Sequence, residues 1–387
     1  MAIANKQEFY VELESIRGLM AWWVVFGHLY SCFRLAIGHV PPVINEILLA
    51  TAIPVDIFIC LSGFFIAMAL SGKRRGYRPY IIRRAFRIIP IYLLAMALAA
   101  LLFNERMSVR VDLPWNTPAQ SAAVENYWTS IAGNITTYLI PCVLLLQGLI
   151  PDQWLAHAGD AFLAPAWSLT LEWQFYLIAP FLVAVFSYRR GKELLVVSSL
   201  VALLFLENSG LTFSYGSFIL IKLPVFIIGM LTHDLFHREK GALRNGLLII
   251  VIVLAVGLIA RSFANFASIM LWAVLAIVIK LNSKLDQPVL TRMLELSKTP
   301  LRNKILVRLG GVSYSTYLIH ILVIDLVMIA AKKLGYLSGD RVVLFIVLSI
   351  LLTYFISSLI HKWVELPFIE MGKKLAASVY SRELKCE

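Results

Sequence analysis

The sequence predicts an all-α, polytopic integral membrane protein, and three observations support this class. First, 60% of the 387 residues are hydrophobic and only 15% are charged, whereas soluble proteins are about half apolar and about a quarter charged. Second, apolar runs close to the ~20 residues that a membrane-spanning helix needs recur along the chain. Third, the sequence lacks the alternation of period two that a membrane β-barrel requires.

The net charge of +12 is better explained by cytoplasmic loops than by nucleic-acid binding, because Lys and Arg are enriched on the cytoplasmic side of membrane proteins. The stretch 71–87 carries seven basic residues and no acidic one, so we expect it in the cytoplasm. Glu8, Glu12 and Glu14 precede the first apolar run, where a cleaved signal peptide would be basic. We therefore expect the first helix to remain in the mature protein, and no nucleic-acid partner.

About ten membrane-spanning helices are expected from the apolar runs and from the basic loops between them. The loop at 71–87 directs the first helix outward and the second back, and the later basic loops continue the alternation. Both termini are then cytoplasmic, and 369–387 is a short cytoplasmic tail. The expected spans are 15–33, 47–70, 88–103, 167–186, 193–207, 216–232, 245–260, 265–281, 309–331 and 342–361.

Segment 126–150 is apolar enough to be another span, but we expect it to be re-entrant. If it crossed the membrane, the basic stretch at 187–192 would lie outside. Gly133, Pro141 and Gly148 interrupt the segment, and a broken backbone at membrane depth is tolerated where protein buries it. The prediction is therefore a re-entrant segment after the third helix.

The four cysteines contain no CxxC pair, so neither a disulfide framework nor a zinc site is indicated. His233 and His237 have the spacing of metal ligands, but no third ligand lies nearby in the sequence. We expect no metal.

Ionisable residues inside the predicted spans are functional candidates, because lipid burial of such groups is costly. A structural network of satisfied pairs is the alternative for each of them. Arg17 and His28 are eleven residues apart, which places them on one helix face about 16 Å apart. Arginine suits phosphate recognition and neutral imidazole suits proton abstraction, although Arg17 is also placed to snorkel to the interface. The candidates are Arg17, His28, Asp56, Glu172, Lys222, His320 and Asp325.

Five stretches, taken in order, resemble the motifs of the acyltransferase 3 family of integral membrane O-acyltransferases, and they cover about 13–368. One departure is that Trp173 follows Glu172 where the family usually has an acidic pair. The matching stretches are Arg17 with His28 (R-x10-H), LSGF at 61–64 preceded by Asp56, Arg84 with Arg87 (R-x2-R), WSLTLEWQFY at 167–176 and SYSTYLIH at 313–320.

This resemblance implies a single membrane-embedded acyltransferase domain over 1–387, in the inner membrane of a bacterium. It implies acyl-coenzyme A as the donor, most often acetyl-coenzyme A, and a hydroxyl acceptor such as a surface or secreted glycan. Family members have a ten-helix core with a re-entrant loop after the third helix. We expect no fused extracytoplasmic domain, so that any second transfer step would need a separate protein partner.

For the mechanism, we expect Arg17, Arg84 and Arg87 to bind the phosphates of the donor. His28 is the expected general base. Glu172 or Asp56 is expected to orient it, and Ser62, Tyr317 or His320 to stabilise the oxyanion. Direct transfer and an acyl-His28 intermediate both remain open. The substrate or oxyanion candidates are Ser62, Trp167, Tyr176, Lys222, Ser313, Tyr314 and Tyr317.

The principal alternative function is a proton-coupled secondary transporter, in which Asp56, Glu172, Lys222 and His320 would form a relay. A further alternative keeps the enzyme class but changes its substrates. The acceptor would then be a lipid, a small metabolite or an antibiotic, or the donor would carry succinyl.

Overall fold

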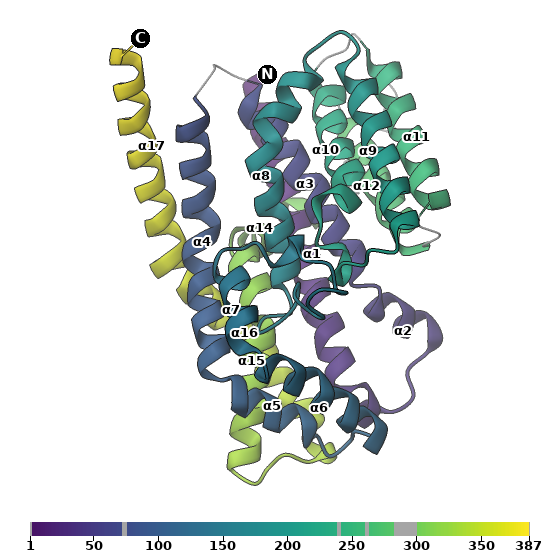
Figure 1. Ribbon diagram of the computed structural model, residues 1–387, viewed down its shortest axis with the longest axis vertical. Coiled ribbons are helices and arrows are strands. Elements are labelled where there is room, and N and C mark those ends of the chain that lie inside the picture. The colour runs from purple at the N-terminus through teal and green to yellow at the C-terminus, as the bar shows by residue number, and fades with distance from the viewer. Residues whose placement is uncertain (1, 72–75, 238–240, 260–262, 282–299, 387) are drawn as a thin grey trace.

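The computed structural model describes residues 2–71, 76–237, 241–259, 263–281 and 300–386, and these ranges contain helices and no strand. The expected all-α fold is confirmed, and the chain is a multi-pass membrane protein. The N- and C-terminal ends of the chain lie at the same end of the helix bundle, at the top of Figure 1.

Each predicted span corresponds to a helix. Among the described residues, eight segments are long and apolar enough to cross a membrane. Two predicted spans are not among these eight segments. The fifth, 193–207, has a short apolar core in the sequence, and the eighth, 265–281, contributes only the shorter apolar helix Ala267–Ala276. The ten helices are α1 (Ala2–Ile37), α3 (Ala52–Leu70), α4 (Tyr77–Leu101), α8 (Ala166–Phe186), α9 (Gly191–Ser209), α10 (Ile219–His237), α11 (Ala242–Ile259), α12 (Phe263–Leu281), α15 (Ser313–Lys333) and α16 (Val342–Ile360).

Shorter helices and single turns connect these elements. The connecting helices are α2 (Pro42–Leu49), α5 (Phe103–Val111), α6 (Pro118–Ala132), α7 (Ile135–Val143) and α14 (Lys304–Gly311), and the 21-residue helix α17 (Leu366–Cys386) is the last element. Turns of 3-10 helix lie at Gln147–Leu149, Ser214–Gly216, Pro300–Arg302 and Gly339–Arg341, and a π-helical turn at His361–Glu365 joins α16 to α17.

Segment 126–150 is not one continuous transmembrane helix. It contains the end of α6, the whole of α7 and the 3-10 turn that follows, and the first break falls at Gly133 and Asn134. A helix of nine residues such as α7 is about 14 Å long, too short to cross a bilayer. The broken course agrees with a re-entrant segment, which stays a prediction.

Two helix pairs, α3 with α10 and α1 with α14, cross at very short distance, and a glycine makes each crossing possible. At the crossing of α3 and α10, a Cβ on Gly63 would lie 2.1 Å from the carbonyl oxygen of Phe226. Where α14 meets α1, a Cβ on Gly310 would lie 1.9 Å from the carbonyl oxygen of Glu14. Such contacts exclude any side chain, so these glycines fix how near α3 and α1 come to their neighbours.

Residues 369–386 of the predicted cytoplasmic tail form most of α17. This helix lies along α4 (Figure 1). A Cβ on Gly372 would lie 2.5 Å from Cβ of Phe86 on α4, so the two helices are in close contact. The C-terminal segment is therefore a helix packed on α4, and its cytoplasmic location stays a prediction.

Candidate active site

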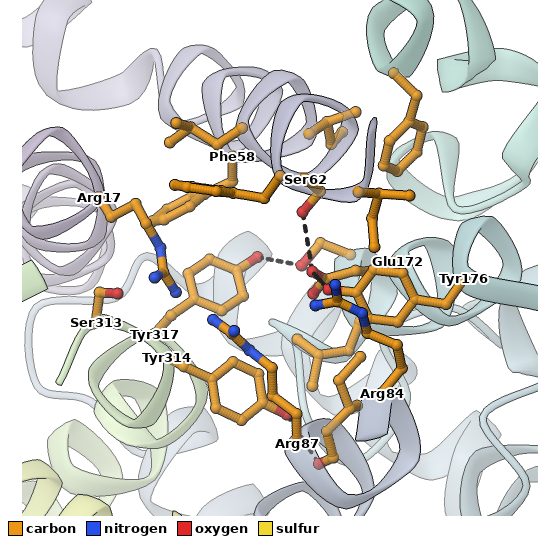
Figure 2. A pocket seen from close by; sticks show the side chains of 18 of the residues that line it. Arg17, Phe58, Ser62, Arg84, Arg87, Glu172, Tyr176, Ser313, Tyr314 and Tyr317 are labelled. Atoms are coloured by element: carbon orange, nitrogen blue, oxygen red, sulfur yellow. Dashed lines mark hydrogen bonds between the residues drawn. The ribbon is translucent and has the colours of Figure 1, made fainter. Parts of the chain in front are cut away.

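A pocket of about 260 Å³ lies between α1, α3, α4, α8 and α15. Figure 2 shows its polar side chains pointing toward one another from these helices. The pocket therefore brings together side chains from all five stretches that the sequence singled out. The predicted residues that line it are Arg17, Ser62, Arg84, Arg87, Glu172, Tyr176, Ser313, Tyr314 and Tyr317.

Three guanidinium groups face this pocket (Figure 2). Arg17 donates to both carboxylate oxygens of Glu14, at 3.0 and 3.2 Å. The guanidinium carbon of Arg84 lies 5.1 Å from the ring centroid of Tyr176. Arg87 has no hydrogen bond or ion pair to another residue within the described part of the chain. With Glu172 as the second carboxylate, the lining carries one net positive charge, which suits an anionic ligand such as phosphate.

Glu172 is held inside this pocket by neutral donors. The hydroxyl of Ser62 on α3 donates to it at 2.9 Å, and the hydroxyl of Tyr176, one helical turn further along α8, donates to the same oxygen. Asp56 lies elsewhere, between α3, α10 and α12. It accepts from Lys222 Nζ at 2.7 Å and from Ser268 Oγ at 2.9 Å. Both carboxylates therefore have partners in place.

The expectation that Glu172 or Asp56 orients His28 is corrected by the hydrogen bonds of the imidazole. Nδ1 of His28 lies 3.0 Å from the carbonyl oxygen of Val24 and 3.2 Å from Nε2 of His320. Nδ1 of His320 lies 2.7 Å from the carbonyl oxygen of Tyr317. The residue that contacts the imidazole of His28 is thus a second histidine.

These contacts determine the tautomers, because a carbonyl oxygen only accepts hydrogen bonds. Each neutral imidazole therefore carries its proton on Nδ1. Nε2 of His320 then accepts from Nδ1 of His28. Nε2 of His28 holds a lone pair and has no protein partner among the described residues. It is the nitrogen left to take a proton from a substrate. His320 has no N–H left for an oxyanion, which corrects its predicted role as a donor.

Two cavities at the other end of α1 meet at His28. One measures about 580 Å³ and the other about 530 Å³. They share His28, Thr51, Ala164 and Tyr215. The second cavity also contains Trp167 and Lys222, the two predicted substrate candidates that do not line the arginine pocket. We call these two the outer cavities and the arginine-lined one the inner pocket.

Tyr317 lies between the inner pocket and the 530 Å³ outer cavity. Its side chain lines the inner pocket and the 530 Å³ outer cavity, as does Val55. The Tyr317 hydroxyl lies 2.7 Å from Oγ of Ser168, and the ring of Phe58 packs edge-on against it with centroids 5.8 Å apart. His28 lies on the outer side of this barrier and Arg17 on the inner side. The same helix therefore reaches both compartments, as the predicted face of α1 requires.

Sequence reasoning missed the ion pairs on the outer side. Asp325 appeared only as an isolated ionisable residue. In the structure it accepts from Arg106 Nε at 2.7 Å and from Arg110 Nε at 2.6 Å. The spacing of four between the two arginines, which places them on one face of a helix, was the available signal.

A family model described as an acyltransferase domain matches residues 10–361. The comparisons with curated proteins and with solved structures gave no match. The matched range contains all the predicted site residues, from Arg17 to His320, and it extends from α1 to the π-helical turn after α16. On this match over most of its length, the chain belongs to the acyltransferase 3 family of membrane acyltransferases.

Proposed function

We propose that this protein is an integral membrane O-acyltransferase of the bacterial inner membrane, with both termini cytoplasmic. It moves an acyl group, acetyl in the simplest case, from cytosolic acyl-coenzyme A to a hydroxyl of a cell-surface or secreted glycan. The observation that carries the proposal is the division of the site by Tyr317. An arginine-lined pocket lies on one side of this residue, and His28 lies in open cavities on the other.

The inner pocket is the proposed donor site. Coenzyme A carries phosphates that need several cationic donors, and arginine binds phosphate through a planar, bidentate fork. Arg17, Arg84 and Arg87 supply these forks. The eleven residues from Arg17 to His28 correspond to a rise of about 16 Å along α1. In this proposal the thin pantetheine arm of the donor spans this distance past Tyr317, so that the thioester reaches His28.

At His28, Nε2 takes the proton of the acceptor hydroxyl as its oxygen attacks the thioester carbonyl. The C–S bond then breaks, and the departing thiolate takes the proton back from the imidazolium. Nδ1 of His28 keeps its proton throughout and donates it to His320 and Val24. This arrangement supports the Val24 carbonyl as the group that holds the tautomer and His320 as a second acceptor that stabilises the imidazolium. An acyl-His28 intermediate would use the same nitrogen and give the same products.

Of the predicted oxyanion donors, Tyr317 has the most favourable surroundings. The hydroxyl of Ser62 donates to Glu172, and both ring nitrogens of His320 have partners. The Tyr317 hydroxyl shares one hydrogen bond with Ser168, in which either oxygen can be the donor. It can therefore turn its proton toward a developing oxyanion between the two compartments.

The test measures release of free coenzyme A from acetyl-coenzyme A by purified protein in lipid nanodiscs. Wild type is compared with His28→Ala and with His39→Ala, a control in an exposed loop. The acceptor panel contains glycans, a lipid alcohol and small metabolites. We expect acceptor-dependent release by wild type and the control, and its loss in His28→Ala with acetyl-coenzyme A still bound. Equal release by all three would remove His28 from the chemistry. Failure of wild type to bind any acyl-coenzyme A would overturn the proposal and favour the transporter.

A further inference from the structure

Asp160 is a buried carboxylate with an unused hydrogen-bonding atom. It belongs to the loop between the 3-10 turn at Gln147–Leu149 and α8, and it lines the 580 Å³ outer cavity together with His28. The residue is only 6% exposed, yet its Oδ1 has no hydrogen-bond partner within the described chain. Buried polar atoms are normally hydrogen-bonded, and the Asp160 side chain lines a cavity, so a ligand in that cavity can supply the donor that Oδ1 lacks.

Neighbouring cations do not satisfy this carboxylate. Nδ1 of His157 lies 4.0 Å from Oδ1 of Asp160, which is beyond hydrogen-bonding distance. Arg106 and Arg110 line the same cavity, but both donate to Asp325. The cavity therefore contains Asp325, which is paired with two arginines, and Asp160, whose Oδ1 lacks a partner within the described chain.

The backbone that carries Asp160 is strained and firmly held. His157 and Phe162, on either side of it, adopt left-handed backbone angles, with φ of +58° and +61°. Such conformations are uncommon for residues other than glycine and persist where the surroundings fix them. Side chains from three helices do so here: Arg106 donates to the Phe162 carbonyl, Tyr127 to that of Asp160 at 3.2 Å and Tyr138 to that of Ala156 at 2.8 Å.

The cavity around Asp160 has both apolar and polar walls. The ring of Tyr127 packs edge-on against His157, with centroids 4.9 Å apart. Tyr215, which borders both outer cavities, stacks on Trp167 with centroids 5.9 Å apart. A volume of about 580 Å³ is in the usual range for small-molecule sites, which combine aromatic walls with a few converging polar groups.

We propose that Asp160 is an acceptor-positioning residue, whose carboxylate accepts a hydrogen bond from one hydroxyl of a polyhydroxylated acceptor while His28 deprotonates another. Above its pKa of about 7 the carboxylate is ionised and can only accept, so its ligand must then bring a donor. An acceptor with a single hydroxyl cannot serve both residues at once, whereas a sugar ring with several hydroxyls can. The inference rests on the proposed function and assigns the outer cavity to the carbohydrate part of the acceptor.

The test compares wild type with Asp160→Asn, Asp160→Glu and Asp152→Asn. Asp152 is the matched control, because it lies in the same loop but lines neither outer cavity, and its partner Ser214 can still donate to an asparagine. The probes are four p-nitrophenyl glycosides (gluco, galacto, manno and N-acetylglucosamine) and benzyl alcohol as a single-hydroxyl acceptor. Binding is measured by saturation-transfer NMR, and acyl transfer by kcat and KM with acetyl-coenzyme A.

We expect at least one glycoside to bind wild type. Asp160→Asn replaces a charged acceptor oxygen with a neutral one, so it should weaken glycoside binding and raise the KM of that glycoside by about 10-fold. The Kd of acetyl-coenzyme A should not change. Asp160→Glu should recover part of the loss, and Asp152→Asn should behave as wild type.

Equal glycoside binding by wild type and Asp160→Asn would overturn the assignment, as would a preference for benzyl alcohol. If no glycoside binds although acetyl-coenzyme A does, the inference fails and the proposed acyltransferase stands. If acetyl-coenzyme A does not bind either, the proposed function itself fails.

Discussion

Replacement of His320 tests whether the histidine pair works as one unit. In His320→Leu, Nδ1 of His28 loses one of its two hydrogen-bond acceptors and keeps the Val24 carbonyl at 3.0 Å. The tautomer of the base should therefore survive, and only the stabilisation of the imidazolium should weaken. In His320→Gln, the amide oxygen can still accept from His28. The two variants thus separate the loss of an acceptor from the loss of a histidine.

The magnitude follows from the geometry of the contact. A hydrogen bond to a charged group contributes about 1.5–3 kcal/mol. The contact between His320 Nε2 and His28 Nδ1 is 3.2 Å long and is shared with Val24, so we take the lower end, about 1.5–2 kcal/mol. At about 1.4 kcal/mol for each factor of ten in rate, kcat should fall by about 10- to 30-fold in His320→Leu, and less in His320→Gln.

The assay is steady-state release of coenzyme A by each variant in nanodiscs, with thermal unfolding to check that the protein is folded. KM for acetyl-coenzyme A should stay near the wild-type value, because His320 does not line the inner pocket. A wild-type kcat in His320→Leu would refute the reasoning. Folded Leu and Gln variants that are both as inactive as His28→Ala would refute it too, because His320 would then take part in the chemistry itself.

Three further predictions concern the donor site, the outer loop and the fold. Arg87→Ala should raise the Kd of acetyl-coenzyme A by about 10- to 100-fold through the loss of phosphate contacts, measured by calorimetry, whereas exposed Arg78→Ala should not. Burial raises the pKa of Asp160 to about 7, so the folded protein favours the protonated carboxyl. The stability that this preference contributes is full below about pH 4 and is lost as pH rises through 7. Asp160→Asn should therefore unfold at a higher temperature than wild type at pH 8, and the two should unfold at the same temperature near pH 4. Gly63→Ala must push α3 away from α10 and should cost about 1–3 kcal/mol of unfolding free energy in a detergent-based thermal assay, whereas Gly246→Ala, where an added Cβ meets nothing within 4 Å, should not.

Contacts within one helix were largely predictable from the sequence, and contacts between helices were not. The spacing of Arg17 and His28 predicted that one helix would carry both residues about three turns apart. In the structure both lie on α1, Arg17 in the inner pocket and His28 in the outer cavities. The hydrogen bond between His28 and His320 joins residues separated by 292 positions, and only the packing of α1 against α15 decides it. A carboxylate partner for His28 was the reasonable expectation from chemistry alone, because carboxylates commonly orient catalytic histidines.

Irregular segments escaped prediction for a different physical reason. Hydrophobic periodicity identifies helices, but the loop that carries Asp160 has no period to read. Its shape depends on two left-handed residues that are not glycine and on side chains that reach it from α5, α6 and α7. The C-terminal helix α17 was missed because its polar composition resembles that of a tail, while its packing along α4 depends on a glycine.

The barrier at Tyr317 has a consequence for the cell beyond the reaction. On the proposed function, the inner pocket opens to the cytoplasm and the outer cavities to the opposite face. A continuous aqueous path between them would let ions through and dissipate the membrane potential. Tyr317, Ser168 and Phe58 form the seal between the two compartments. A pantetheine arm threaded past them would fill the opening that it makes. The bound donor would then block ion flow through the opening that it occupies, and the membrane would stay impermeable to ions during each turnover.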